Sequence, residues 1–533
     1  MTGAPDIVDD LSRRDAYETD PGRIDLRVTH ASWVFLTERD VWKVKRPVDL
    51  GFLDFRTLEA RRRACEEEVR LNRRLAPDVY LGVHPIRLTA SGCGFVGDGA
   101  IVDWAVRMRR LPDDAGASTL LAQGRLDARL LSSVAEKLAV FLREARVAPR
   151  FGMPDVLSFN LEENFSQVAP FIGDSLDQKT FDEVQAFQRG QLAGNRARFI
   201  ARIAEGRIRE GHGDLRLEHI YFLAGQDGRL EPTVIDCIEF NERFRCGDVA
   251  AELAFLSMEL EAAGWQDLAA GVVARFAEAS DDFGLYGVLD FYLSYRAWVR
   301  GKVAAFVASD PATPGDLRAS KRDEAHRCFA LARAVSGVPI DRPFVIAIGG
   351  PIGSGKSTLA VELGRELAVP VVSSDRTRKA TAGVAPTARA DRSSYTPEAR
   401  DRTYEEIIRR AGQVAGTGRG VILDATFAAS GWRQRAAEAA RAANATFVWI
   451  EALCPENLLR QRLGARRQSP SVSDADDTLL DDFMQGYEPA GSGDPRPHLS
   501  VDTSGGDPEP ASRAALAGLF EAGIAPASSR RDA

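Results

Sequence analysis

The sequence predicts two domains of different fold class, an α+β domain followed by an α/β domain with a parallel sheet. The chain has 533 residues, which is enough for two or more domains that each bury a core. Before about residue 310, strand-like runs are followed by long helices, whereas after residue 343 short apolar runs alternate with helices. The stretch "SGVPIDRP" lies between the two patterns and places the boundary near Gly337.

The first domain is expected at residues 25–310, after an N-terminal tail at 1–24. In it, "ASWVFLT" and "VWKVKRPV" alternate in hydrophobicity and flank the polar turn "ERD", which predicts a β-hairpin. The charged stretch "FRTLEARRRACEEEVRLNRRLAP" predicts a helix, because its apolar residues recur at helical spacing. Further strands are expected at "VHPIRLT", "DWAVRMRRL" and "PTVIDCIEF".

The second domain is expected at 343–505, after a linker and helix at 311–342. Its short apolar strands are "FVIAIGG", "PVVSSD", "GVILDAT", "TFVWIEAL" and "HLSVDTS". Helical stretches separate them, which predicts a three-layer α/β/α arrangement around a parallel sheet. Residues 506–533 are expected to form a C-terminal helix and a tail that is disordered from Ile524.

Composition bounds the setting in which the protein works. The net charge of −8 disfavours nucleic-acid binding by the whole surface but allows a local basic groove. The six cysteines are scattered, so we expect neither a zinc site nor a disulfide framework, and a reducing cytoplasm fits best. The polar first residues do not predict a signal peptide, and no apolar run approaches the ~20 residues that span a bilayer.

A phosphate-binding loop (P-loop) is predicted in the second domain, where "GPIGSGKS" fits G-x-x-x-x-G-K-[ST]. An apolar strand precedes it and a helix follows, a context that a chance Gly-rich turn would lack. Glycines let backbone N–H groups close around phosphates, and the helix N-terminus adds positive potential. Lys356 is expected to reach the β- and γ-phosphates of ATP, and Ser357 to ligate Mg²⁺. The expected ATP-binding residues are Gly350, Gly353, Ser354, Gly355, Lys356, Ser357 and Thr358.

Two carboxylates are expected at strand ends, where ligands gather in open parallel sheets. Asp424 closes "VILD" and is expected to hold Mg²⁺ through water, and Asp375 closes "VVSSD" and is expected to orient or deprotonate an acceptor hydroxyl. Each can instead cap the following helix. Arg462 and Arg466 are candidates for neutralising charge on the transferring group, with a solvated helix face as the alternative.

Residues 343–503 resemble the AAA-family P-loop kinases of small molecules and nucleic-acid ends, including zeta-toxin-like and polynucleotide-kinase-like proteins. The matching text is the P-loop, "SSDRTRK", "ILDATF", an arginine-bearing lid and "VDTS". The resemblance implies that Asp375 and Arg378 handle the acceptor and that Arg462 or Arg466 belongs to the lid. It does not identify the acceptor.

The first domain offers a second set of groups that phosphoryl transfer from ATP needs. Asp214 in "HGD" is the candidate acid beside an acceptor hydroxyl, and Asp236 in "VIDCIEF" is the candidate Mg²⁺ ligand. Lys43 and Lys45 lie two apart on one strand and so face the same side; Lys43 is preferred as the phosphate contact because it directly follows "VW". Glu68 is expected to fix that lysine, unless it is a solvated charge in the run "EEE".

This half resembles the aminoglycoside phosphotransferase-like kinases, and in particular a bacterial group that is fused to a P-loop ATPase. The resemblance rests on "HGDLRLEHIYF", "VIDCIEFNERFRCGDVAAELAFL" and "YRAWVRGKVAAF", and it covers most of residues 25–310. It implies a bilobal kinase-like fold that uses ATP, with Asp214 as the catalytic aspartate and Asp236 as the metal ligand. The acceptor does not follow from the fold.

His219 stands where that family has an asparagine. An amide oxygen suits Mg²⁺, whereas neutral imidazole suits softer metals. The alternatives are that His219 binds Mg²⁺ poorly, contacts phosphate as an imidazolium, leaves a single metal, or is a packed histidine without a metal role. Glu218 and Glu239 are nearby oxygen donors that can substitute.

The sequence therefore predicts an ATP-dependent phosphotransferase with two ATP-binding modules and a small-molecule hydroxyl as acceptor. One alternative is an end kinase of oligonucleotides, which the acidic composition disfavours. The other is an ATP-gated regulatory protein with an inactive kinase-like half. The oligomeric state does not follow from the sequence.

Overall fold

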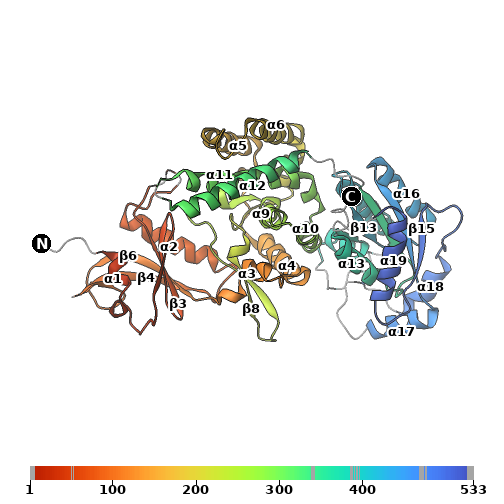
Figure 1. Ribbon diagram of the computed structural model, residues 1–533. Helices are drawn as coiled ribbons and strands as arrows, with labels where there is room; N and C mark the ends of the chain where they lie inside the picture. Colours follow the sequence, from red (N-terminus) through yellow and green to blue (C-terminus); the bar gives the residue numbers. More distant parts are fainter. Residues whose placement is uncertain are drawn as a thin grey trace. The chain divides into compact units, whose positions relative to one another are not determined.

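The computed structural model describes residues 6–524, except 50, 52, 90, 312, 338–342, 385–387, 389–390, 392–393, 395, 467–472 and 474–476. The chain forms two compact units (Figure 1). Unit 1 contains Met1–Ser133, Phe141–Val156 and Ile203–Leu256, and unit 2 contains Val134–Val140, Leu157–Arg202 and Ser257–Ala533. The tail predicted from Ile524 lies outside the described residues, apart from Ile524 itself.

Unit 1 is built on a six-stranded antiparallel sheet in the order β1-β2-β3-β6-β4-β5. The predicted hairpin is present, with Leu36 opposite Val41 across the turn. The short helix α1 (Ile7–Leu11) in the predicted N-terminal tail packs on this sheet through Leu11, which is fully buried. The strands are β1 (Asp25–Val28), β2 (Ser32–Leu36), β3 (Asp40–Lys45), β4 (Tyr80–Thr89), β5 (Gly92–Gly94) and β6 (Ile101–Arg109).

Helix α2 (Leu58–Asn72) covers β4 and β6 of this sheet (Figure 1). It begins after Thr57, whose hydroxyl accepts a hydrogen bond from the Ala60 N–H. Cys65 and Val69 bury one face of the helix in a cluster with strand residues. Glu68 follows Cys65 by three residues and therefore lies on the same face of the helix. The packing of this face holds its carboxylate against the sheet.

Two short strand pairs follow the helical region in sequence and belong to unit 1. Strands β7 (Ile208–Glu210) and β10 (Cys246–Asp248) pair, as do β8 (Ile220–Ala224) and β9 (Leu230–Val234). The predicted strand "PTVIDCIEF" is wrong in length, because β9 ends at Val234. Asp236 has φ 65°, and a left-handed residue cannot continue a strand ladder.

Unit 2 contains a helical part and a sheet. In the helical part, α6 (Gln178–Gly194), α11 (Tyr286–Ser309) and α12 (Gly315–Gly337) pack together. Trp298 of α11 is fully buried against Phe165, Phe181 and Phe329, which makes it a core residue. Trp265, by contrast, is 43% exposed.

The sheet of unit 2 is parallel and has the order β12-β13-β11-β14-β15. On one face, α13 (Lys356–Leu367) and α19 (Glu509–Glu521) share a core with the strands. On the other face, α15 (Pro397–Ala415) and α16 (Ser430–Ala442) contact β13 and β14. The predicted three-layer fold is confirmed. The strands are β11 (Phe344–Gly349), β12 (Val371–Ser373), β13 (Val421–Asp424), β14 (Thr446–Leu453) and β15 (His498–Asp502).

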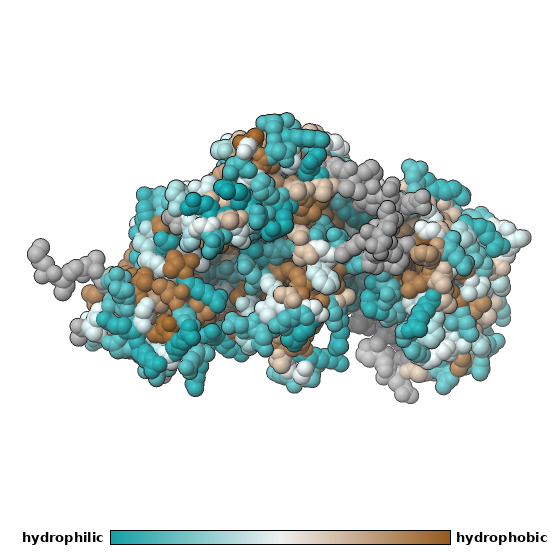
Figure 2. Space-filling model, in the orientation of Figure 1, coloured by the Kyte–Doolittle hydropathy of each residue, from teal (hydrophilic) through white to brown (hydrophobic). Residues whose placement is uncertain are grey.

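Hydrophilic side chains cover most of the face shown in Figure 2, with smaller apolar areas between them. Among the described residues, none of the helices combines the length and the apolar character that crossing a membrane requires.

Candidate functional site

The P-loop connects β11 to α13 in unit 2. Gly350, Gly353 and Gly355 have φ of 137°, 82° and 89°, which only glycine adopts readily. At Gly350 a Cβ would also lie 2.4 Å from the carbonyl oxygen of Ala452, so the backbone approach itself requires glycine. Ser354 is fully buried, and its carbonyl accepts a hydrogen bond from the Thr503 hydroxyl. The loop is thus anchored to the segment that follows β15.

Lys356, Ser357 and Asp424 meet at the carboxyl end of the sheet. The Ser357 hydroxyl donates to Asp424 Oδ1 at 3.1 Å, and Lys356 Nζ lies 3.4 Å from the carbonyl oxygen of Pro351 within the loop. Burial raises the pKa of Asp424, Asp375 adds to this rise, and the Lys356 ammonium opposes it. Thr358 follows on the exposed side of the first helical turn. A hydroxyl and a carboxylate are hard oxygen donors, so this pair fits Mg²⁺ bound together with phosphates.

Asp375 does not close a strand, because β12 ends at Ser373 and Asp375 lies in the first turn of α14 (Ser374–Thr381). β12 ends where its pairing with β13 ends. The last paired residue, Ser373, lies opposite Asp424 at the carboxyl end of the sheet. Arg378 lies one turn further along α14, and its Nη1 donates to Asp375 Oδ1 at 2.7 Å. The two predicted acceptor residues therefore form an ion pair with each other.

The arginines of α17 (Glu456–Arg466) have different surroundings. Arg462 Nη2 donates to the carbonyl oxygens of Thr503, Ser504 and Gly505, at 2.8, 3.3 and 3.0 Å. Its Nη1 lies 3.5 Å from the position that a Cβ on Gly355 would take, so the guanidinium is next to the P-loop. Arg466 ends α17, and its side chain lies outside the described residues.

In unit 1, the two strand lysines share one buried carboxylate. Lys43 Nζ lies 2.9 Å from Glu68 Oε1, and Lys45 Nζ lies 2.6 Å from Glu68 Oε2. Each lysine has a second partner: Lys43 pairs with Asp236 at 2.6 Å, and Lys45 pairs with Glu239. Burial opposes ionisation of Glu68, but the two ammonium groups hold its pKa below the usual value. Glu68 is therefore a fixed partner of both lysines and not a solvated charge.

Asp214, His219 and Asp236 come together in the same unit. His219 Nδ1 lies 2.8 Å from the carbonyl oxygen of Asp214, and its Nε2 lies 3.6 Å from Asp236 Oδ2. Burial opposes ionisation of Asp236, but Lys43 and His219 lower its pKa well below the usual value. His219 thus lies beside the predicted metal carboxylate, with one ring nitrogen engaged by the backbone.

Neither site is a preformed metal cage. Within the described residues, no three or more His, Cys, Asp or Glu side chains are grouped so as to hold a metal ion. In unit 1 the Asp236 carboxylate is already paired with Lys43. Divalent cations in nucleotide sites are held by one or two carboxylates together with phosphates, so both donor sets fit Mg²⁺ only as part of a nucleotide complex.

Sequence reasoning missed groups that support these sites from a distance along the chain. Tyr80 of β4 accepts a hydrogen bond from the Asp236 N–H at 3.1 Å, and Thr503 supports the P-loop. The Tyr404 hydroxyl of α15 forms hydrogen bonds with Thr426 and Phe427, in the segment after Asp424. Tyr80 and Tyr404 stand in ordinary amphipathic stretches, so the sequence carried no signal for their roles. Thr503 stands in "VDTS", but nothing in the sequence points to its carbonyl partner.

His212, two residues before Asp214, is 1% exposed, and burial lowers its pKa to about 4. Its Nε2 donates to the carbonyl of Ile235 at 2.8 Å, and its Nδ1 accepts from the Asp214 N–H at 3.3 Å, so the neutral ring fits. A depressed histidine pKa means that the unfolded chain binds the proton more tightly. Stability from this residue is thus complete above pH 6.5 and falls as the pH drops toward 4.

We expect unit 1 to lose about 2 kcal/mol of unfolding free energy between pH 7.5 and pH 5 through His212. Urea unfolding of the wild type and of His212→Gln at both pH values measures this, with the variant expected to show a smaller difference between them. Equal losses in both proteins would assign the pH dependence to other groups.

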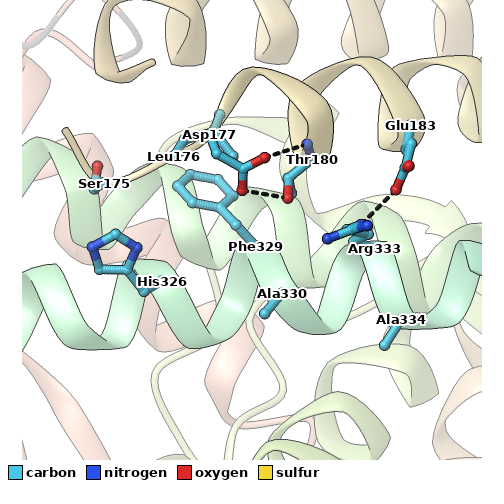
Figure 3. A pocket seen from close by; sticks show the side chains of 10 residues that line it. All are labelled: Ser175, Leu176, Asp177, Thr180, Glu183, His326, Phe329, Ala330, Arg333 and Ala334. Carbon is cyan, nitrogen blue, oxygen red and sulfur yellow. Dashed lines mark hydrogen bonds and ion pairs between the residues drawn. The ribbon is translucent and has the colours of Figure 1, made fainter. Parts of the chain in front are cut away.

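A separate pocket of about 580 Å³ lies between α6 and α12 in unit 2 (Figure 3). Phe329 and Ala330 of α12 line it, together with Asp177 at the start of α6. Asp177 accepts hydrogen bonds from the backbone N–H and the hydroxyl of Thr180, at 2.8 and 2.6 Å. No residue predicted to bind ATP, metal or acceptor lines this pocket.

Comparisons with known proteins find one matching family and several similar structures and sequences. A family described as an AAA domain matches residues 345–490. A gluconokinase structure from Sinorhizobium meliloti 1021 is similar to this chain at 20% identity, covers 34% of it and 93% of itself, and has a TM-score of 0.26. The structure of the GDP and kanamycin complex of APH(2")-IIia covers 59% of this chain and 95% of itself at 14% identity, with a TM-score of 0.34.

A choline/ethanolamine kinase family protein from Mesorhizobium loti covers 60% of this chain and 89% of itself, at 13% identity and a TM-score of 0.36. The AAA-domain match and the parallel sheet confirm the predicted P-loop fold of the second half. Uncharacterized protein Mb2027c of Mycobacterium bovis and uncharacterized protein Rv2004c of Mycobacterium tuberculosis are each 30% identical over 471 residues, which is 86% of this chain and 89% of theirs. The chain therefore belongs to the family of these two mycobacterial proteins.

Proposed function

We propose that this protein is an ATP-dependent phosphotransferase that moves the γ-phosphate of ATP to a hydroxyl group of a small molecule, with the P-loop site of unit 2 as its engine. The proposal rests on one observation. Lys356, Ser357 and Asp424 lie together at the carboxyl end of the sheet, beside the Asp375–Arg378 pair. Phosphoryl transfer depends mainly on positioning and charge neutralisation, and this set supplies both.

Each residue of the P-loop site has a distinct role in this proposal. The loop N–H groups and Lys356 hold the β- and γ-phosphates. Ser357 and Asp424 hold Mg²⁺, which when bound neutralises phosphate charge. Asp375 orients the acceptor hydroxyl and accepts its proton, and Arg378 fixes the Asp375 carboxylate through their 2.7 Å contact. Arg462 holds the Thr503–Gly505 carbonyls beside the loop.

In the same proposal, unit 1 binds a second ATP. Lys43 contacts phosphates while Glu68 holds it in place, and Asp236 with His219 lies on the metal side. Asp214 is then the carboxylate that lies beside the acceptor hydroxyl and accepts its proton. Lys43 pairs with Oδ1 of Asp236, so a metal on this carboxylate would use Oδ2.

The same contact favours a second candidate function, in which unit 1 only senses ATP and regulates unit 2. Lys43 neutralises Asp236, and the ring of His219 is tied to the Asp214 backbone, so the groups for transfer are engaged with one another. In this alternative, ATP binding to unit 1 changes the activity of the P-loop site without transfer at Asp214.

Turnover of ATP labelled at the γ-phosphate, measured with a panel of hydroxylated metabolites and short oligonucleotides, tests both. We expect transfer to a metabolite that Lys356→Ala eliminates. Loss of transfer in Asp214→Ala as well, with ATP binding retained, would show that transfer also needs Asp214, whereas unchanged transfer in this variant would favour the regulatory alternative. Transfer only to oligonucleotide ends would replace the small-molecule acceptor. ATP hydrolysis without any labelled acceptor would overturn the phosphotransferase proposal.

A further inference from the structure

The turn that follows β13 has a strained backbone next to the P-loop. Phe427 has φ 46°, and its side chain is fully buried. A bulky residue rarely adopts this left-handed conformation, because its Cβ crowds the backbone. Such strain persists only where the surroundings impose it, and it gathers at functional sites.

Tyr404 of α15 imposes this conformation. Its hydroxyl accepts a hydrogen bond from the Phe427 N–H at 2.8 Å and lies 3.0 Å from the Thr426 hydroxyl. Its ring lies between Phe427, at 5.4 Å, and Trp432, at 4.8 Å, and it is 5% exposed. A buried phenol needs a partner for its proton. Because this buried phenol proton needs an acceptor and Thr426 Oγ1 lies 3.0 Å away, we assign the phenol as the donor to Thr426 Oγ1.

That donation determines what the Thr426 hydroxyl can do. With its oxygen accepting from Tyr404, its own proton is left to donate elsewhere. Thr426 is half-buried, unlike its neighbours Ala425 and Phe427, which are buried. The hydroxyl is therefore held in one orientation at the edge of the packed core.

The turn is also joined directly to the phosphate site. The carbonyl oxygen of Thr426 accepts a hydrogen bond from the N–H of Gly350, the first glycine of the P-loop, at 3.1 Å. Two residues earlier, Asp424 accepts from Ser357. The Ala425 N–H donates to the carbonyl of Ile348, at the end of β11. Thr426 thus lies between the loop that holds the phosphates and the candidate Mg²⁺ ligand.

We propose that Thr426 is a further residue of the nucleotide site, whose hydroxyl donates a hydrogen bond to an oxygen of the γ-phosphate, and that Tyr404 is the residue that positions it. The proposal rests on ATP binding at the P-loop, as in the proposed function, but not on the identity of any acceptor. A neutral donor aimed at the γ-phosphate adds to the charge of Lys356 without adding charge of its own.

Binding of ADP and of β,γ-imido ATP to the full chain with Mg²⁺ tests this, with the signal that Lys356→Ala eliminates taken as P-loop binding. Thr426→Val is expected to weaken the imido-ATP complex roughly tenfold or more, since a hydrogen bond to a charged group is lost, and to leave ADP affinity unchanged. Thr426→Ser is expected to retain the wild-type preference. Tyr404→Phe should give the same selective loss, and the double variant should lose no more than either single one.

Tyr487→Phe is the matched control, because it removes another hydrogen-bonded tyrosine hydroxyl, half-buried and bonded to Glu451 at 2.6 Å, from the same part of the chain. It should leave the ratio of the two affinities unchanged. Equal weakening of ADP and imido-ATP by Thr426→Val, or no weakening, would overturn the proposal and leave Tyr404 as a packing residue. If Tyr404→Phe does not fold, the two Thr426 variants still decide. If Thr426→Val weakens imido-ATP binding selectively but the protein transfers phosphate to no acceptor, the proposed function is contradicted and the role of Thr426 is not.

Discussion

Replacing Lys356 by alanine is expected to lower the rate of phosphoryl transfer by about 10²- to 10³-fold, the effect of removing one preorganised charge from a transition state. The ammonium stands on the first turn of α13, beside the three positive-φ glycines of the loop. The fold of the loop rests on other contacts, among them the Thr503–Ser354 hydrogen bond and the close approach of Gly350 to Ala452. Initial rates with labelled ATP measure the change, and the thermal unfolding temperature should stay within a few degrees of the wild type.

Lys179→Ala is the control for this variant, because its side chain is 70% exposed on α6 and lies 3.9 Å from Glu183. It removes a lysine of the same chemistry and is expected to leave transfer unchanged. Full activity in Lys356→Ala would show that the P-loop site does not catalyse the transfer, and Asp214 of unit 1 would then be the residue to replace next.

Replacing Glu68 by glutamine is expected to destabilise unit 1 by about 3 kcal/mol or more, because it leaves buried ammonium groups without their shared counter-charge. Lys45 is 1% exposed and Glu68 is fully buried, so water does not compensate. In the variant, Lys43 keeps Asp236 and Lys45 keeps Glu239 as its carboxylate partner. These two carboxylates alone then balance the two ammonium charges. Urea unfolding, followed by the fluorescence of unit 1 tryptophans such as Trp42, measures the loss.

Glu66→Gln tests whether this effect belongs to burial. Glu66 lies two residues earlier on α2, with its side chain 50% exposed and paired to Arg62 at 2.9 Å. An exposed i,i+4 pair contributes less than about 1 kcal/mol, so this variant should remain close to the wild type. A similar small loss in both variants would mean that solvent reaches the two lysines in the native state.

Features that depend on neighbouring residues could be predicted from the sequence. The P-loop is one, because its glycines, lysine and serine are consecutive and the flanking strand and helix are patterned by their own side chains. The hairpin that carries Lys43 and Lys45 is another, since alternation fixes which side of the strand each lysine faces. Glu68 was expected for a different reason, because kinase-like phosphoryl transfer needs a helix glutamate that fixes the lysine, and it pairs with both lysines.

Features that depend on distant residues could not be predicted. Asp375 was expected at a strand end, but the pairing of β12 with β13 ends at Ser373, and that register is set across the sheet. Arg462 was expected to face phosphate, whereas it also binds three carbonyl oxygens some 40 residues later, at Thr503 to Gly505. Tyr404 precedes Phe427 by 23 residues, and only the folding of α15 onto the sheet brings them together.

The left-handed backbone of Asp236 decides which substitution can reveal the role of its side chain. Alanine at φ 65° would remove the carboxylate and, with it, the short polar side chain that helps a residue tolerate this left-handed conformation. A loss of activity in Asp236→Ala would therefore mix two causes. Asparagine tolerates this conformation and keeps the side-chain volume. Asp236→Asn thus removes the charge and one acceptor oxygen without disturbing the backbone, whereas glycine removes the side chain and relaxes the backbone.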